Sequence, residues 1–146
     1  MTSTLDEFAT KFRVADLTVL KLDHWTWSMR PAHCTLGSGI LSLNRFCTSL
    51  AGITPAEGSE LATAAKEIER RLRSAFQIDK LNYLMLMMVD AHLHFHVIPR
   101  YATPRQFAEI SWVDAGWPTL PALNEGAAYQ NHPVLAEICE RLTTPV

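Results

Sequence analysis

The sequence predicts a sheet of antiparallel strands with one long amphipathic helix packed against it. Strand-length segments rich in β-branched, leucine and aromatic residues occupy residues 13–28, 37–42 and 81–100. Between them, residues 54–76 carry apolar side chains at three- and four-residue intervals, the spacing of one helix face. A meander is the simplest arrangement of these strands, and the helix then packs its apolar stripe on the sheet.

The first strands are expected in residues 13–22, and the alternating aromatic residues of 24–28 continue them. Pro31 marks a connection, after which a glycine turn opens the next strand at residues 37–42. These segments predict neighbouring strands joined by short connections.

The long helix has a clear start signal. Thr54 can cap it, Pro55 suits its first helical position, and Glu57 completes a capping box. The helix is expected to end at about Phe76. Its apolar positions are Leu61, Ala65, Ile68, Leu72 and Phe76.

The second half of the chain predicts a hairpin, an irregular segment and a helix. Residues 81–88 form an apolar run that is too short to span a membrane and leads through a short turn to residues 90–100. Residues 102–132 are rich in proline, glycine and alanine, which indicates ordered but irregular structure. A final helix is expected at residues 133–142.

Length and composition indicate an ordinary globular domain. The chain has 146 residues, of which 48% are hydrophobic and 19% charged, so it is neither disordered nor membrane-spanning in character. We expect a single domain over residues 1–146, with a core at 13–101 and a C-terminal extension at 102–146.

The charge excludes some partners. A net charge of −2 gives no general attraction to nucleic-acid polymers or to anionic membranes. A small nucleotide-like ligand is still compatible, because backbone N–H groups and a few side chains suffice to bind a phosphate.

The cysteines and the first residues indicate the compartment. Cys34, Cys47 and Cys139 are odd in number and lack CxxC spacing, so we interpret them as reduced packing residues. Residues 1–9 contain two acidic side chains and lack the basic and apolar regions of a secretory signal. The cytoplasm is the expected location.

Residues 90–100, with the sequence DAHLHFHVIPR, contain the candidate functional residues. His92, His94 and His96 alternate in a strand-forming run, so their imidazoles share one face while the apolar residues between them share the other. A purely structural role would bury three polar rings without gain. Imidazole could instead bind zinc, but no acidic residue follows soon after His96. In a third interpretation an imidazole attacks phosphorus.

The run His-Leu-His-Phe-His-Val-Ile, followed by Pro99 and Arg100, resembles the signature of the histidine triad (HIT) family of nucleotide hydrolases and transferases. The order of a glycine-containing strand, a capped helix, a strand and the histidine strand is also similar, from about Leu17 to Tyr101. The resemblance implies an α+β fold, in which an antiparallel sheet carries one main helix beside the short C-terminal helix. It also implies a homodimer.

The resemblance further implies that His94 is the nucleophile and forms a covalent nucleotidyl-histidine intermediate. His92 and His96 would orient the imidazole and the phosphate, with His96 closer to the leaving group. The implied enzyme is a hydrolase that acts on the α-phosphate of a dinucleoside polyphosphate or a nucleoside phosphoramidate. No cofactor is obligatory in this interpretation, although a divalent metal at the histidines stays open. The alternatives are a non-catalytic nucleotide-binding regulatory module and a histidine-ligated metal-binding protein.

Five further residues are candidates for substrate binding. Trp25 and Trp27 alternate near the position where family members hold the purine and ribose, so either could stack on a base or pack in the core. Ser28 is a candidate ribose contact. Ser38 occupies the position of a further histidine in the family. Asp90 lies in a turn shorter than the family's glycine-rich one, where it forms the turn or fixes a histidine tautomer.

Overall fold

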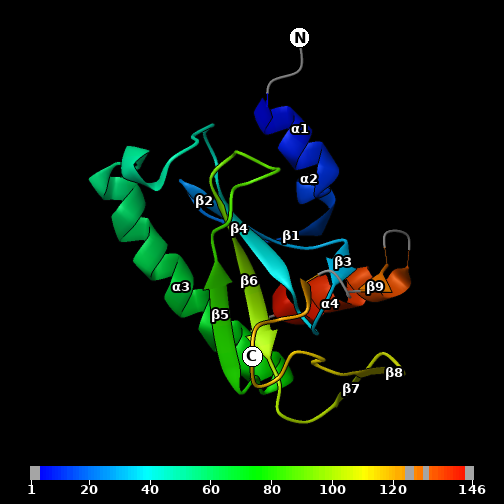
Figure 1. Ribbon diagram of the computed structural model, residues 1–146. Helices are drawn as coiled ribbons and strands as arrows, with labels where there is room; N and C mark the ends of the chain where they lie inside the picture. Colours follow the sequence, from blue (N-terminus) through cyan, green and yellow to red (C-terminus); the bar gives the residue numbers. More distant parts are fainter. Residues whose placement is uncertain (1–3, 124–126, 130–131, 144–146) are drawn as a thin grey trace.

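A five-stranded antiparallel sheet forms the centre of the fold in the computed structural model, which describes residues 4–123, 127–129 and 132–143 (Figure 1). The strand order is β1-β2-β4-β6-β5, and every neighbouring pair is antiparallel. The strands are β1 (Thr18–Lys21), β2 (Trp25–Met29), β4 (Gly39–Leu43), β5 (Lys80–Leu84) and β6 (His94–Arg100). The predicted α+β class is confirmed.

The main helix, α3 (Pro55–Phe76), begins as the sequence predicts. The Thr54 hydroxyl accepts from the Glu57 amide at 3.1 Å, and the Glu57 carboxylate accepts from the Thr54 amide at 2.8 Å. Glu57 also accepts two 2.8 Å bonds from Arg45, which follows β4. No helix in the described part of the chain is long and apolar enough to cross a lipid bilayer.

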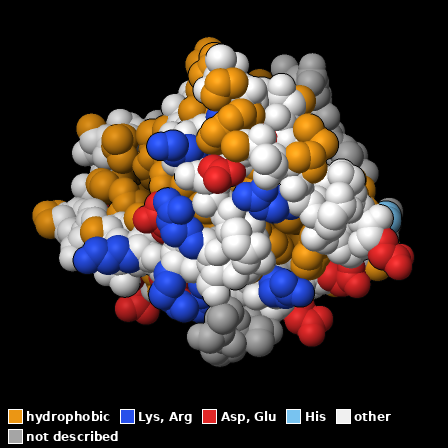
Figure 2. All heavy atoms as spheres, turned by 90° about the horizontal axis from the view of Figure 1, so that it is seen from below, with side chains coloured by type: hydrophobic (Ala, Val, Ile, Leu, Met, Phe, Trp, Pro, Cys, Tyr) orange, Lys and Arg blue, Asp and Glu red, His pale blue; other side chains and the backbone are white. Residues whose placement is uncertain are grey.

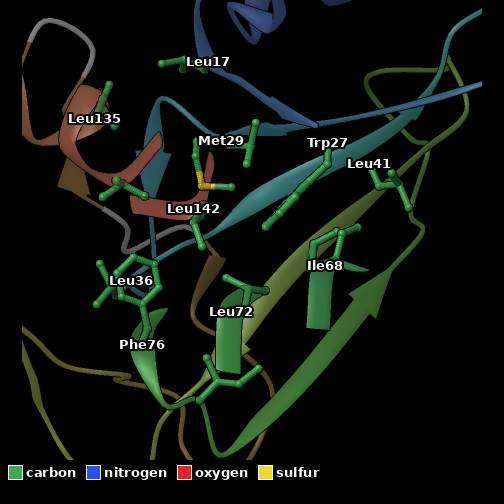
Figure 3. Close-up of a cluster of buried hydrophobic side chains, with 14 of the residues drawn as sticks. Leu17, Trp27, Met29, Leu36, Leu41, Ile68, Leu72, Phe76, Leu135 and Leu142 are labelled. Carbon is green, nitrogen blue, oxygen red and sulfur yellow. The ribbon is translucent and has the colours of Figure 1, made fainter. Parts of the chain in front are cut away.

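The core lies between α3 and one face of the sheet (Figure 3). Ile68, Leu72 and Phe76 of the helix pack there against the sheet. Trp27 and Met29 of β2 point toward the same cluster. The core therefore takes alternate residues of each strand and leaves the other residues of β2, β4 and β6 for the opposite face.

The C-terminal helix α4 (Pro133–Thr143) closes one side of this core. Its Leu135 and Leu142 lie near Leu17, Met29 and Leu36 in Figure 3. The predicted final helix is confirmed, and it ends one residue later than expected. The three cysteines are free and partly buried, as predicted.

The N-terminal region differs from the prediction. Helix α1 (Thr4–Lys11) was not predicted, and a second short helix, α2 (Val14–Leu17), replaces the first residues of the strand expected from residue 13. The Thr18 hydroxyl donates to the Val14 carbonyl at 2.6 Å, which closes this helical turn. The strand expected in residues 13–22 therefore begins only at Thr18, although the residues before it include a β-branched one.

The strand expected at 81–88 is also shorter than predicted. β5 ends at Leu84, which pairs with His96 near the start of β6, so the ladder provides few further partners. Met87 then adopts a positive φ of 49°. The loop that follows exposes 84% of Met88 and 88% of Val89, because hydrophobic character alone does not supply a neighbouring strand.

The segment after β6 contains more regular structure than predicted. β7 (Arg105–Phe107) and β8 (Ile110–Trp112) form a hairpin, and β3 (Ala32–His33) pairs with β9 (Ala127–Ala128). A short 3₁₀ helix, η1 (Leu50–Gly52), precedes α3. Figure 2 shows the molecule from below the view of Figure 1, and basic side chains lie beside acidic ones on this side.

A buried ion pair fastens this segment to the sheet. Arg100, at the end of β6, donates from Nε to Asp114 Oδ2 at 2.7 Å and from Nη1 to the Asn82 side chain at 2.8 Å. The Tyr101 amide donates to the same carboxylate at 3.1 Å. Arg100 therefore has structural partners for its guanidinium nitrogens, Asp114 and Asn82.

Gly39 has no room for a side chain. A Cβ there would lie 2.8 Å from both the Met29 Cε and the Ser28 carbonyl, and 2.9 Å from the Trp27 indole nitrogen. We therefore expect Gly39→Ala to lower the free energy of unfolding by about 1–3 kcal/mol through overpacking, measured by urea denaturation.

Gly58→Ala is the matched control. Its Cβ would meet only Ile53 Cδ1 at 3.9 Å, an ordinary contact in the first turns of α3. This variant should gain up to about 1 kcal/mol from helix propensity. Equal stability changes for the two variants would contradict the close approach at Gly39.

Candidate active site

The three histidines lie on the sheet face opposite α3, which we call the histidine face. His94 pairs with Ser42 of β4, and His96 pairs with Ile40. His92 precedes the strand, whereas the prediction placed it inside. The residues between the histidines point to the α3 side, where Leu93 is fully buried in the core. The predicted alternation is therefore found.

His94 has a fixed tautomer. Its Nδ1 lies 2.6 Å from the main-chain oxygen of His92. A carbonyl oxygen can only accept, so Nδ1 carries the hydrogen and donates it. The lone pair then resides on Nε2, which makes Nε2 the nucleophilic atom of a neutral ring.

His92 is held by main-chain groups on both ring nitrogens. Its Nε2 donates to the Leu43 carbonyl at 2.8 Å, and the Cys47 amide approaches its Nδ1 at 3.5 Å. The Phe46 ring stacks on the imidazole with centroids 5.7 Å apart. His92 thus supports His94 with its backbone oxygen while its own ring is fixed.

His96 is less constrained. Its ring lies edge-on to that of His94, with centroids 5.0 Å apart. Its Nδ1 is buried and has no hydrogen-bond partner. His96 therefore offers Nδ1 to a bound group, whereas both ring nitrogens of His92 already contact main-chain groups.

Burial keeps these imidazoles neutral. Burial lowers the pKa of His96 to about 4, and the charges of Arg30 and His94 act in the same direction. Burial also lowers the pKa values of His92 and His94 below their ordinary value. A neutral His94 has the free lone pair that attack on phosphorus requires.

Helix α1 covers the histidines. The Phe8 ring lies 5.0 Å from the His92 ring and 4.9 Å from the His94 ring, centroid to centroid, and Phe12 lies 6.1 Å from His94. Both phenylalanines pack with Ile40 of the histidine face. His94 is consequently 2% exposed, and its surroundings are apolar.

An ion pair ties α1 to the loop before the triad. Lys11 Nζ lies 2.9 Å from both carboxylate oxygens of Asp90. The sequence predicts Asp90 as a turn residue or a ligand contact. In the structure its carboxylate forms an ion pair with Lys11 of α1. The contact is partly exposed, so its contribution to stability is small.

The two tryptophans lie away from the histidines. Trp25 and Trp27 are 0% exposed and belong to the core on the α3 side. The Trp25 indole donates to the Glu57 carbonyl at 2.8 Å. The structure does not bring either indole to the histidine face, because the strand alternation turns both toward α3.

The two serines differ in their placement. Ser28 lies on the histidine face, in the cross-strand row Ser28–Ile40–His96, and its hydroxyl is buried without a partner. Ser38 instead closes a turn, because its hydroxyl donates to the Thr35 carbonyl at 2.8 Å and accepts from the Thr35 amide at 3.1 Å. The structure brings Ser28, but not Ser38, into line with the histidines.

Sequence reasoning missed three residues at this site. Phe8 and Phe12 stand four residues apart, the spacing of one helix face, and this signal could have predicted α1. Arg30 stands two residues after Ser28, so it shares the histidine face by strand alternation. Its electrostatic effect reaches both His94 and His96.

The ring nitrogens are poorly arranged for a metal ion. Nε2 of His92 and Nδ1 of His94 are directed at main-chain oxygens, and those atoms are therefore protonated. Among the described residues, no group of three or more His, Cys, Asp or Glu side chains has the geometry to hold a metal.

Comparison with known proteins identifies the domain. Residues 41–103 match the family model of the HIT domain. No curated protein matches the chain in sequence. Solved structures with a similar fold include a Hit-like protein involved in cell-cycle regulation from Bartonella henselae, with a TM-score of 0.64, 17% identity, and coverage of 93% of this chain and 92% of that one.

Two further structures share the fold. A hypothetical histidine triad nucleotide-binding protein from Sulfolobus tokodaii has a TM-score of 0.66 and 16% identity, with 92% of this chain and 89% of that chain covered. The NitFhit protein of C. elegans has a TM-score of 0.65 and 18% identity over 88% of this chain, which spans 27% of that protein.

The chain thus contains a HIT domain and has the fold of histidine triad proteins. The resemblance predicted from the histidine motif is confirmed.

Stability should fall in mild acid. Burial lowers the pKa of the fully buried His33 to about 4, so between about pH 6.5 and this value the unfolded chain binds the proton and the folded chain does not. Unfolding free energy from urea denaturation should drop by about 2 kcal/mol from this group alone between about pH 7.5 and pH 5. His33→Gln should reduce this drop by that amount, and an unchanged drop in the variant would exclude His33 as the source.

Removal of the Phe8 ring should expose the triad. We expect Phe8→Ala to raise the rate at which diethyl pyrocarbonate modifies His92 and His94 several-fold, measured by peptide mass spectrometry. Exposed His132 provides the internal control, because it lies outside the site and its rate should not change. Equal rates for His94 in the parent and the variant would show that α1 does not shield it.

Proposed function

We propose that this protein is a hydrolase that cleaves a phosphoanhydride or phosphoramidate bond at the α-phosphate of a nucleotide-like substrate. The observation that carries the proposal is the 2.6 Å bond from His94 Nδ1 to the His92 carbonyl, which leaves Nε2 as the atom with the lone pair. The confirmed HIT domain supports nucleotide chemistry in general. The substrates to test are dinucleoside polyphosphates and nucleoside phosphoramidates.

The reaction proceeds in two balanced steps. In the first, the His94 Nε2 lone pair forms a bond to the α-phosphorus, and the bond from that phosphorus to the leaving oxygen or nitrogen breaks. The leaving group departs with its electron pair and takes up a proton. In the second step, water attacks the same phosphorus, the P–N bond breaks, and His94 returns to its neutral form; the proton that the water releases to solvent balances the one that the leaving group took from solvent.

The neighbouring residues position this chemistry. The His92 carbonyl accepts the Nδ1 hydrogen and so stabilises the positive charge that develops on His94 during attack. His96 has a buried ring nitrogen without a partner, and that atom can contact a phosphoryl oxygen or the leaving group. Phe8 keeps the surroundings apolar, which strengthens these electrostatic contacts.

The proposed chemistry uses the chain's own imidazoles and requires no metal ion. The family resemblance extends the proposal to a homodimer in the cytoplasm with a small nucleotide-like ligand. These properties are independent of the attack by His94 and are tested separately, the dimer by light scattering of the purified protein.

His94→Asn tests the nucleophile. The variant should lose at least about 10³-fold in kcat on diadenosine polyphosphates and on nucleoside phosphoramidates, because the amide cannot form the covalent intermediate. Mass spectrometry of the parent, quenched during turnover, should detect a nucleotidyl group on the peptide that contains His94. His24→Asn, which alters a histidine outside the site, should keep the parent's activity. Turnover by His94→Asn at the parent's rate would refute the proposal.

A nucleotide-binding regulatory module is the second candidate, and the position of Phe8 favours it. The ring packs on both His92 and His94, so the nucleophile is 2% exposed in this conformation. Calorimetry with AMP and GMP beside the turnover assay separates the two functions. Stoichiometric binding without turnover of any substrate would favour the regulatory module.

A further inference from the structure

Three polar groups on the histidine face are buried without a hydrogen-bond partner. They are Nε and Nη1 of Arg30, Oγ of Ser28 and Nδ1 of His96. Buried polar groups in proteins are nearly always satisfied, because an unsatisfied donor or acceptor loses its hydration without compensation. Three such groups on one face therefore indicate a ligand that contacts them.

The sheet register places the three groups together. Ser28 pairs with Ile40, which pairs with His96, so these side chains form one row across β2, β4 and β6. The Arg30 amide donates to the Ser38 carbonyl at 3.0 Å, which extends the β2–β4 ladder by one step. Arg30 is thus on the same face, about 6.6 Å along the strand from Ser28.

Arg30 differs from two other arginines near the sheet, the exposed Arg45 and the buried Arg100. Arg45 pairs with Glu57, and Arg100 pairs with Asp114, each through two hydrogen bonds. In the described part of the chain, no carboxylate forms an ion pair with Arg30, and burial lowers the pKa of its guanidinium. A guanidinium with two buried nitrogens and no anion is unfavourable, so a negative charge is expected to come from a bound molecule.

The position of Arg30 separates it from the scissile phosphate. On the histidine face, His94 lies in the cross-strand row Thr26–Ser42–His94, and His96 lies in the next row with Ser28 and Ile40. Arg30 follows Ser28 by two residues, so it lies one row beyond His96 and two rows from His94. The phosphate attacked by His94 already has His92 and His96 beside it. The guanidinium therefore addresses a different part of the ligand.

We propose that Arg30 and Ser28 form a subsite for a second anionic group of the ligand, separate from the phosphate at His94. The proposal rests on the proposed function for the position of the first phosphate. It defines the ligand class as nucleotide-like molecules with two anionic groups, the second being a phosphate on the leaving-group side or on the ribose side. Arg30 binds it through the planar N–H donors that match phosphate geometry.

Calorimetry with three probes tests this subsite. AMP has one phosphate, ADP adds a second at the leaving-group side, and adenosine 3′,5′-bisphosphate adds it at the ribose side. The parent should bind at least one of the two bisphosphates about tenfold or more tightly than AMP. The preferred bisphosphate shows which side of the ligand reaches Arg30.

Arg30→Gln should abolish this preference while AMP affinity stays close to that of the parent. Arg30→Lys should keep part of it, because the charge remains but the fork geometry does not. Ser28→Ala should weaken it by a smaller factor. Arg70→Gln, an exposed arginine on α3 away from this face, is the matched control and should bind all probes as the parent does.

Two results would overturn the subsite. The first is equal affinity of the parent for AMP and both bisphosphates, which includes the case that none of them binds. The second is an unchanged preference for a bisphosphate in a folded Arg30→Gln variant. Removal of an unpaired buried charge should not lower stability, and thermal denaturation checks this for each variant. Binding is measured without turnover, so the result is independent of catalysis by His94. Loss of catalysis in the parent with an intact preference would refute only the proposed hydrolase.

Discussion

The pairing of β4 with β6 determines both the core and the site. Gly39 pairs with Val97 and Ser42 pairs with His94 in this register, so every second residue of β6 enters the core and the others lie on the histidine face. A shift of one residue would turn the histidines into the core and the apolar residues to the opposite side. The absence of a side chain at Gly39 lets β4 lie close to β2 on its other side, because a Cβ there would collide with Met29 and Ser28.

The site is built from polar groups that are removed from water, and the main chain compensates most of them. The imidazoles of His92 and His94 each donate to a carbonyl, and these bonds select the tautomers. Arg30, Ser28 and His96 lack such compensation. The contrast divides the face into a part where the main chain fixes the rings of His92 and His94 and a part whose polar groups have no partner.

The sequence predicts most of the central fold. The capping box at Thr54 and Glu57 and the alternation around His94 depend on local patterns, which single sequences display. Trp25 and Trp27 show the limit of that reasoning. Alternation places both tryptophans on one face of the sheet. Which face lies against α3 depends on contacts with residues far along the chain, and both indoles lie in the core.

The cover over the triad was missed for a similar reason. Eight residues of α1 are too few to form a stable helix alone, so its structure depends on contacts of Phe8 and Phe12 with distant residues. Arg30 was missed because an arginine after a strand is usually exposed. Only the three-dimensional register reveals that its Nε and Nη1 are buried beside the histidine row.

The start of α3 is mechanically connected to the triad. Glu57 caps the helix and also binds Arg45, which is two residues before Cys47. Cys47 in turn accepts from the Leu93 amide at 2.7 Å and contacts the His92 ring with its own amide. A change at this distant helix end would therefore alter the orientation of an imidazole, so a substitution at a helix cap would be felt at the histidine face.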